Sequence, residues 1–169
     1  MDVELKLLNI IMENEKINQR AIAKEVGVSL GTINSMLKAL EEKQYLMISK
    51  ASNNSARYLL TEEGRTFRSQ KLYAYIVECS EMITRVRISV KSLLLALCSQ
   101  KISHFYLSES EDEFSRIVML ILMEISRKTA ISYSSEIPEK LPDNSVILGW
   151  KSDNPYRKLK SYVHIINKI

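Results

Sequence analysis

Residues 16–61 restrict the possible folds of this chain more than any other stretch. A short polar segment that favours a helix ends at Gly27, and a second segment with helical spacing begins at Ser29. Two strand-forming runs on either side of a turn-prone cluster follow, at 45–49, 51–55 and 57–60. The sequence therefore predicts a helix, a tight turn, a second helix and a β-hairpin.

The turns of this stretch carry residues that suit them. Gly27 can adopt the positive φ that ends one helix and lets the next leave at a steep angle. Ser29 is a good N-cap, because its hydroxyl can accept a hydrogen bond from an amide of the first turn. Apolar residues three and four positions apart predict the buried face of the second helix: Val28, Ile33, Leu37 and Leu40. This is the order of a winged helix-turn-helix, which places its second helix in a major groove.

The opposite face of the second helix is polar and slim, and it has no acidic residue before Glu41. Small side chains first, hydrogen-bonding groups next and then a cation suit a helix that approaches base edges. We expect this face to bind DNA through Ser29, Leu30, Gly31, Thr32, Asn34, Ser35 and Lys38. Asn34 and Ser35 are the candidates for base readout, and Thr32 is a candidate for contact with a phosphate or a thymine methyl.

Further DNA contacts are expected from the first helix of the motif and from the hairpin. They are Arg20, Lys24, Lys50, Asn53, Asn54 and Arg57, with Lys16 as another candidate for phosphate. We expect Lys50 and Arg57 to hold the backbone or the minor groove. Residues 1–68 carry ten basic and nine acidic side chains, so a single copy would attract DNA weakly and two copies would be needed.

Residues 28–64 resemble the winged helix of MarR-like and related bacterial transcriptional regulators. The family pattern is V-S-x-x-T-V-x-x-x-L-x-x-L-E-x-x-G-L-I, ending in L-T-x-x-G. The matching positions are Val28-Ser29, Thr32-Ile33, Leu37, Leu40-Glu41, Tyr45-Leu46, Leu60-Thr61 and Gly64. Gln44 stands where the family has glycine, so the helix is expected to end without an easy left-handed cap, at ~1 kcal/mol. The resemblance implies the fold more specifically than DNA binding, because some winged helices bind protein.

Residues 62–101 contain no proline and a single glycine, Gly64. Apolar residues recur there at helical spacing: Leu72, Ile76, Ile83, Val86, Val90, Leu93, Leu94 and Leu97. One long helix or two joined end to end is expected. Its stripe could pair with a second copy or pack on the rest of the chain. We expect a homodimer built mainly by 65–101 and 111–128. A charge at Leu94 or Val118 should then give monomers or insoluble protein.

Residues 102–150 predict a strand, a helix and two further strands. The expected strands lie at 102–107, 130–134 and 146–150. Ser108 or Ser110 could cap the helix, which runs to about Lys128. This order implies a βαβ unit with a small parallel sheet, with a degenerate Rossmann-like fold as one form. A phosphate site there would need glycines, and Glu109, Glu111 and neighbouring acids stand instead. No cofactor is therefore expected.

The remaining features leave alternatives open or exclude function classes. The tail at 155–169 suits a helix, which we favour, although Tyr162–Ile166 also suits a strand. Its basic residues could be a solvated face or contribute to DNA binding. Cys79 and Cys98 are expected to be free buried thiols, with a redox switch as the alternative. No catalytic or metal-binding set is found, so an enzyme is not expected. The N-terminus lacks signal-peptide features, and a cytoplasmic location without a membrane partner is expected.

The sequence thus predicts an α+β protein with three parts: a winged helix at 1–66, a long linking and dimerisation helix at 67–101, and a small α/β domain at 102–169. The expected function is a transcriptional regulator that binds double-stranded DNA as a homodimer on an inverted-repeat operator. The alternative is a winged-helix adaptor that binds protein without sequence-specific DNA recognition. The sequence assigns no small-molecule effector.

Overall fold

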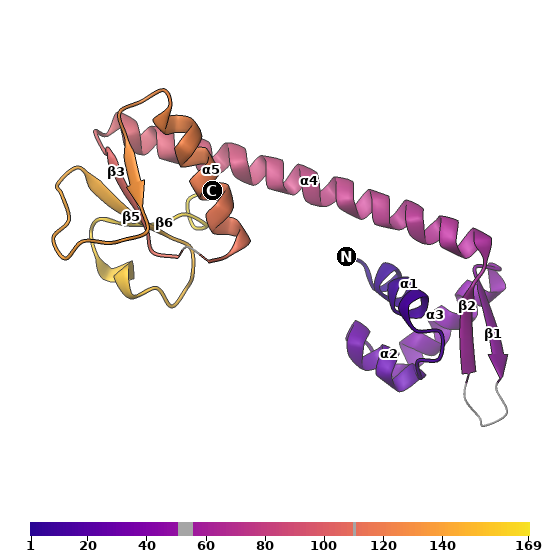
Figure 1. Cartoon of the computed structure of the whole chain (residues 1–169). Coiled ribbons are helices and arrows are strands. Elements are labelled where there is room, and N and C mark those ends of the chain that lie inside the picture. The colour runs from indigo at the N-terminus through magenta and orange to yellow at the C-terminus, as the bar shows by residue number, and fades with distance from the viewer. Residues whose placement is uncertain (51–55, 110) are drawn as a thin grey trace. The chain divides into compact units, whose positions relative to one another are not determined.

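The computed structural model describes residues 1–50, 56–109 and 111–169, except for the side chain of Lys50. The chain forms two compact units, Met1–Ser80 and Glu81–Ile169, which are described separately here. The first unit contains α1 (Val3–Glu13), α2 (Gln19–Val26), α3 (Leu30–Glu42), β1 (Leu46–Lys50), β2 (Ala56–Leu60) and the start of α4 (Glu62–Ser99) (Figure 1). This order is the predicted one, a helix-turn-helix followed by an antiparallel hairpin.

The turn between α2 and α3 has the predicted chemistry. Gly27 ends α2 with a φ of 84°, in the left-handed region that glycine adopts without strain. Ser29 then caps α3, because its hydroxyl oxygen accepts from the Thr32 amide at 3.1 Å. Asn18 caps α2 in the same way, accepting from the Ala21 amide at 2.8 Å. Local residues therefore fix both ends of the turn that orients α3.

The end of α3 corrects an expectation. Gln44 adopts a φ of 61°, so the left-handed turn forms even though the residue is not glycine. The amide of Tyr45 donates to the carbonyl of Leu40, and that of Gln44 donates to the carbonyl of Glu41, both at 2.9 Å. These two bonds satisfy carbonyls that the last helical turn would otherwise leave open. The cost of lacking glycine is therefore strain at Gln44, and the cap itself is complete.

One hydrophobic core holds α1, α2, α3 and the hairpin together. Ile33, Leu37 and Leu40 of α3 are at most 1% exposed. They share the core with Leu7, Leu8, Ile11, Ile22, Val26, Leu46, Tyr58 and Leu60, among others. The face predicted from the spacing of apolar residues is thus the buried face, and the polar side of α3 is left to solvent.

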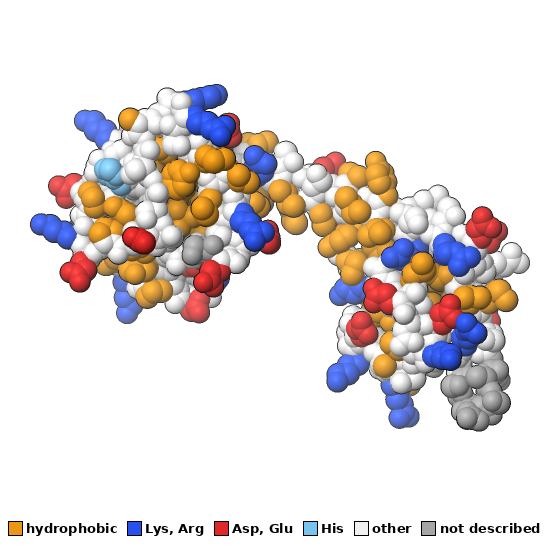
Figure 2. Space-filling view, in the orientation of Figure 1, with side chains coloured by type: hydrophobic (Ala, Val, Ile, Leu, Met, Phe, Trp, Pro, Cys, Tyr) orange, Lys and Arg blue, Asp and Glu red, His pale blue; other side chains and the backbone are white. Residues whose placement is uncertain are grey.

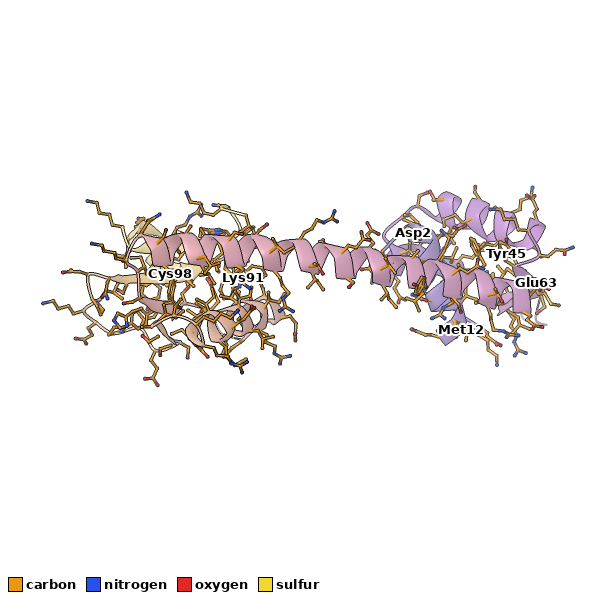
Figure 3. All side chains as sticks on the ribbon, turned by 90° about the horizontal axis from the view of Figure 1, so that it is seen from above. Asp2, Met12, Tyr45, Glu63, Lys91 and Cys98 are labelled. Carbon is orange, nitrogen blue, oxygen red and sulfur yellow. The ribbon has the colours of Figure 1, made fainter. Side chains whose placement is uncertain are left out.

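Thr61 and Gly64 connect the hairpin to α4. The Thr61 hydroxyl donates to the Gln44 carbonyl at 2.7 Å and accepts from the Gly64 amide at 2.9 Å. A Cβ at Gly64 would lie 1.9 Å from the Tyr45 carbonyl oxygen, so no side chain fits there. Ion pairs from Lys71 to Asp2 (2.9 Å) and Glu4 (2.7 Å) attach the next turns of α4 to α1; Asp2 and Tyr45 are labelled in Figure 3.

Helix α4 confirms the prediction of a long helix, as a single element of 38 residues. Its apolar residues divide between two environments. Val90 and Leu94 are fully buried in the core of the second unit, whereas Ile76 and Ile83 are 56% and 46% exposed. Leu94 and Val118, where we expect a charge to give monomers or insoluble protein, are both 0% exposed within their own unit, so a charge at either position would act on the core of that unit directly. None of the described helices combines the length and apolarity needed to span a bilayer.

The second unit is built on a four-stranded parallel sheet in the order β4-β3-β5-β6. Its elements after α4 are β3 (His104–Leu107), α5 (Glu113–Ser126), β4 (Ser132–Ser134), β5 (Ser145–Gly149), η1 (Pro155–Lys158) and β6 (Tyr162–His164). Strand β3, helix α5 and strand β4 form the predicted βαβ unit. Every residue of β5 is buried, as expected for a central parallel strand covered on both faces.

Two expectations for this unit are wrong. The tail is not the favoured helix: it forms the short 3₁₀ helix η1 and then the strand β6, which pairs with β5 from Ile147 to Gly149. The pairing supplies partners for the backbone that local preference could not reveal. The cap of α5 is also not Ser108; Ser110, the other candidate, lies outside the described residues. Asp112 is the cap, and its carboxylate accepts from the Ser115 amide at 2.8 Å.

Candidate nucleic-acid interface

The polar face of α3 is the surface that the sequence predicts to bind DNA. All seven residues predicted on it are exposed: Ser29, Leu30, Gly31, Thr32, Asn34, Ser35 and Lys38. The buried Ile33 and Leu37 anchor the helix from the opposite side. The first acidic residues, Glu41 and Glu42, come in the last turn, so the N-terminal two turns present hydrogen-bonding groups with no repulsion of phosphate.

Two residues at the start of α3 are bonded to each other. The hydroxyls of Ser29 and Thr32 lie 2.8 Å apart in a hydrogen bond, in addition to the amide cap. This bond uses the polar side of Thr32 and leaves its methyl group free to contact an apolar group. Asn34 and Ser35 lie one turn further on and are exposed.

A hollow of about 380 Å³ lies where α2, α3 and β2 meet. Its lining comprises Lys16, Asn18, Gln19, Arg20, Leu30, Ala56 and Tyr58. The structure thus places Arg20, from α2, and Leu30, from the first turn of α3, on one surface. Lys16 and Arg20 give that surface two cations beside the N-terminal end of α2, whose unpaired amides also favour an anion.

The hairpin of β1 and β2 is the wing of the motif. Its described side chains include one cation, Arg57, which is already paired. Both Nε (2.8 Å) and Nη2 (2.6 Å) of Arg57 donate to one carboxylate oxygen of Glu15. The Arg57 and Glu15 side chains are 54% and 36% exposed, so water screens the pair. The amide of Tyr58 also donates to the Glu15 carbonyl at 2.8 Å. Arg57 therefore fixes the wing to the α1–α2 connection, while the side chain of Lys50 and the residues Asn53 and Asn54 lie outside the described part.

The cations of α2 and α3 lie among acids rather than on a uniformly positive face. Lys38 and Glu42 form a weak, solvent-exposed ion pair at 3.8 Å. Lys24 is exposed next to Glu25 in the last turn of α2. On the face shown in Figure 2, Lys and Arg side chains are interspersed with Asp and Glu over the N-terminal unit. Attraction to a polyanion would thus be local, at the hollow and the first turns of α3.

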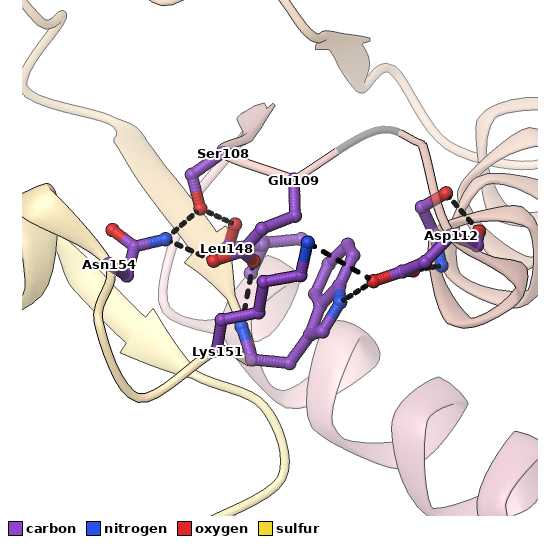
Figure 4. Close-up of polar contacts among 8 residues, drawn as sticks. Ser108, Glu109, Asp112, Leu148, Lys151 and Asn154 are labelled. Carbon is purple, nitrogen blue, oxygen red and sulfur yellow. Dashed lines mark hydrogen bonds and ion pairs between the residues drawn. The ribbon is translucent and has the colours of Figure 1, made fainter.

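The second unit contains a polar cluster at the carboxyl ends of β3 and β5 (Figure 4). The carboxylate of Glu109 is buried and accepts from the Trp150 amide at 2.9 Å and from the side-chain amide of Asn154. Asn154 also donates to the Ser108 hydroxyl at 2.5 Å. In parallel sheets this edge, where the strand order reverses, is the usual ligand position. The protein's own carboxylate takes the amide donors that a ligand anion would need.

Asp112 completes this edge of the sheet. It accepts from the indole nitrogen of Trp150 at 2.9 Å and lies 3.8 Å from Lys151. Partial burial acts to raise the pKa of Asp112, but the hydrogen bonds from Trp150 and Ser115 outweigh it and lower the pKa below its ordinary value. Burial raises the pKa of Tyr162, helped by the nearby Glu109. The hydroxyl of Tyr162 is buried without a hydrogen-bond partner in the described part of the chain.

A serine–histidine contact in the second unit has a structural explanation. His104 Nδ1 and Ser132 Oγ lie 2.6 Å apart, and the two residues are direct neighbours across β3 and β4. No described carboxylate is hydrogen-bonded to this histidine, so the orienting acid of a nucleophilic triad is lacking in the residues described. Among the same residues, no group of three or more His, Cys, Asp or Glu could hold a metal ion.

Sequence reasoning missed several partners of the interface. Gln19 and Asn18 line the hollow, but their positions there depend on the contact of α2 with the hairpin. Glu15 could not be identified as the partner of Arg57, because the two lie 42 positions apart and no local pattern links them. Opposite charge was the available signal, and it does not distinguish Glu15 from other acids of the first unit.

Comparison with known proteins agrees with this geometry. Residues 2–47 match the winged helix-turn-helix DNA-binding family. A segment of 62 residues is 40% identical to the phenylalanine–tRNA ligase alpha subunit of Sulfolobus acidocaldarius. That match covers 37% of this chain and 13% of the relative, so the chain spans a small part of the relative's length.

Solved structures similar to this chain include transcriptional regulators. Streptococcus pneumoniae FabT in complex with DNA is 22% identical, with a TM-score of 0.42, over 57% of this chain and 71% of that one. Staphylococcus aureus MepR, a regulator of a multidrug efflux pump, is 17% identical, with a TM-score of 0.42, over 76% and 80%. The family match, the predicted motif and the observed element order together identify residues of the first unit as a winged helix-turn-helix domain that resembles those of MarR-like transcriptional regulators.

Proposed function

We propose that this protein is a transcriptional regulator that binds double-stranded DNA in a sequence-specific manner, as a homodimer on an inverted repeat. The observation that carries the proposal is the face of α3, where every residue predicted to contact DNA is exposed and no acid precedes Glu41. Asn34 and Ser35 reach base edges from the second turn, since amide and hydroxyl groups can read the major groove. The free methyl of Thr32 suits a thymine methyl.

Phosphate contacts complete the proposed interface. Lys16 and Arg20 line the hollow beside α3, and the amides at the start of α2 add a partial positive charge there. Lys24, Lys38 and the wing residues Lys50, Asn53, Asn54 and Arg57 remain proposals for the same role. Such contacts give affinity and register without sequence information, which is left to α3.

Arg57 has a second possible role in this scheme that an experiment can separate. Its pairing with Glu15 leaves Nη1 available for a phosphate. Arg57→Ala should weaken binding to all duplexes and lower the slope of log affinity against log salt by about one phosphate contact. An unchanged slope would show that Arg57 only holds the wing against Glu15.

The direct test is selection of bound fragments from random duplex DNA by the purified full chain. Enrichment of an inverted repeat with half-sites about one helical turn apart would support both sequence recognition by α3 and the dimer. Enrichment of a single unrepeated site would support sequence recognition by α3 and contradict the inverted-repeat operator. A pool that stays random would contradict sequence-specific recognition.

A winged-helix adaptor is the second candidate, favoured by the exposure of Leu30. This leucine is 39% exposed on the face proposed to bind DNA, where an apolar side chain suits a protein partner. Selection from random duplex DNA separates the two candidates, since an adaptor that binds protein should leave the pool random.

A further inference from the structure

Helix α5 presents an exposed apolar face that the core of its own unit does not use. Met119, Leu120 and Met123 are 42%, 51% and 38% exposed, whereas Val118, Ile121, Leu122 and Ile125 of the same helix are at most 3% exposed. A monomer rarely leaves large apolar side chains side by side on one helix face without a partner. The question is which partner fits.

The charges on this face repeat with opposite sign about Leu120. Arg116 and Glu124 lie four positions before and after it, and Glu113 and Arg127 lie seven positions before and after it. At 100° per residue, all four lie within the same side of the helix as Leu120. A second copy of α5 running antiparallel, centred on Leu120, would therefore set Arg116 opposite Glu124 and Glu113 opposite Arg127. A parallel copy in register would set like charges against each other.

The charged groups on this face are exposed enough to take part. Arg116 pairs with Glu113 at 2.8 Å, and these side chains are 73% and 84% exposed. Glu124 pairs with Lys91 of α4 at 2.6 Å, with both side chains about two-fifths exposed; Lys91 is labelled in Figure 3. Lys91 lowers the pKa of Glu124 through that hydrogen bond, so the carboxylate is charged at neutral pH. A second copy would extend both pairs into networks across the interface.

Helix α4 widens the apolar surface within the same unit. Ile88 and Lys91 of α4 and Ile121 and Glu124 of α5 line a shared groove of about 250 Å³. Ile88 is 61% exposed and Leu95, two turns further on, is 44% exposed. A stable interface buries about 800 Å² per partner, more than one helix face offers, and these α4 side chains extend the surface toward that size.

We propose that the outer face of α5, with Ile88 and Leu95 of α4, is the homodimer surface, and that two copies of α5 pack antiparallel about a two-fold axis at Leu120. A two-fold interface uses the same patch on both copies, so a palindromic charge pattern is self-complementary. The inference rests on the homodimer of the proposed function and adds its surface and orientation.

Sedimentation of the full chain with Leu120→Glu tests the surface. The substitution places two carboxylates on the axis, and the dimer should dissociate at least about tenfold more readily than wild type. Ile166→Glu is the matched control, because Ile166 is 46% exposed in the same unit but outside α5; its dimer should be unchanged. Circular dichroism is the check that both variants are folded. A Leu120→Glu protein that remains a dimer, or a wild-type protein that is a monomer at micromolar concentration, overturns the proposal.

Charge reversal tests the orientation. Arg116→Glu alone and Glu124→Arg alone should each weaken the dimer, and both in one chain should restore it, because the antiparallel pair is rebuilt with its signs exchanged. Loss of the Lys91 contact cannot explain such a restoration, since Arg116→Glu does not rebuild it. Failure of the double variant to recover overturns the antiparallel arrangement. Fragment selection tests the proposed function separately. If the protein selects an inverted repeat but its dimer persists in Leu120→Glu, the proposed function stands and this dimer surface is wrong.

Discussion

Helices α3 and α5 have nearly the same length, 13 and 14 residues, and each buries one face in the core of its unit. Their outward faces differ. That of α3 is small and polar, from Ser29 to Lys38, whereas that of α5 combines Met119, Leu120 and Met123 with charges at its edges. A surface that meets base edges needs hydrogen-bonding groups and little bulk, and a surface that meets another protein needs apolar area with paired charges. The difference supports the proposals that α3 reads DNA and that α5 forms the homodimer surface.

The largest expected effect is on stability, and it should differ between substitutions on the two faces of α5. Val118 is 0% exposed and Leu120 is 51% exposed, although they are two positions apart. Val118→Asp buries a charge without a partner and should destabilise the second unit by about 4 kcal/mol or more. Leu120→Asp should leave the stability of this unit nearly unchanged when all proteins are compared at a concentration at which they are monomers. Denaturant unfolding followed by tryptophan fluorescence measures this unit alone, because Trp150 is the single tryptophan of the chain. Equal destabilisation would show that Leu120 belongs to the core.

The next effect should sharpen the role of α3. Asn34→Ala removes an exposed amide from the proposed reading face without touching the core. Binding to the selected duplex should weaken by about 1–3 kcal/mol, with little change on nonspecific DNA. Ile166→Ala in the second unit is the control, since its side chain is also exposed and is proposed to contact neither DNA nor a second copy. A loss that is equal on specific and nonspecific duplexes would mean that Asn34 does not read bases.

The sequence could predict features that neighbouring residues determine, but not those that depend on contacts between distant residues. Gly27, Ser29 and the spacing of Ile33, Leu37 and Leu40 act within a few residues, and the structure confirms them. The faces of α4 could not be assigned, because helical spacing marks Ile76 and Leu94 alike while only the second unit's core buries Leu94.

The tail shows the same limit for strands. Tyr162–His164 forms a strand because it pairs with β5, whereas local preference alone favoured a helix. The hollow beside α3 forms only because Lys16, Arg20 and Ala56, which are distant in the sequence, lie close together in the fold. The residues of α3 could thus be predicted from their own periodicity, and the pairing of Arg57 with Glu15 could not.

A smaller effect on stability is expected at the C-terminal ends of α3 and α4. Both helices end in a left-handed residue that is not glycine, Gln44 with a φ of 61° and Lys101 with a φ of 70°. At the end of α4 the Ile102 amide donates to the Leu97 carbonyl at 3.2 Å, the same bond that Tyr45 makes at the end of α3. Gln44→Gly should stabilise the first unit, and Lys101→Gly the second, each by about 0.5–1 kcal/mol, because glycine adopts this φ without strain.

Hydrogen exchange resolves which unit gains stability in each variant. Slower exchange in α1 to α3 alone is expected for Gln44→Gly, and slower exchange around α5 and β5 alone is expected for Lys101→Gly. A gain that appears in both units for either variant would contradict their description as two compact units with separate cores.

The smallest effect concerns acid stability, where each unit has one aspartate cap with a lowered pKa. At Asp2 the hydrogen bond from the Leu5 amide is the main cause, followed by opposition from burial and by Lys71. At Asp112, burial opposes the lowering and the bonds from Trp150 and Ser115 prevail.

A carboxylate with a lowered folded pKa contributes stability above its unfolded pKa and loses it as pH falls through the folded value. Asp112→Asn keeps a capping oxygen but has no carboxylate, so it should lower the stability of the second unit modestly at neutral pH and reduce the further loss below about pH 4. Asp2→Asn should do the same for the first unit alone. Trp150 fluorescence across an acid titration reads the first case, and an acid midpoint that does not move in Asp112→Asn would show that other carboxylates set the acid limit of that unit.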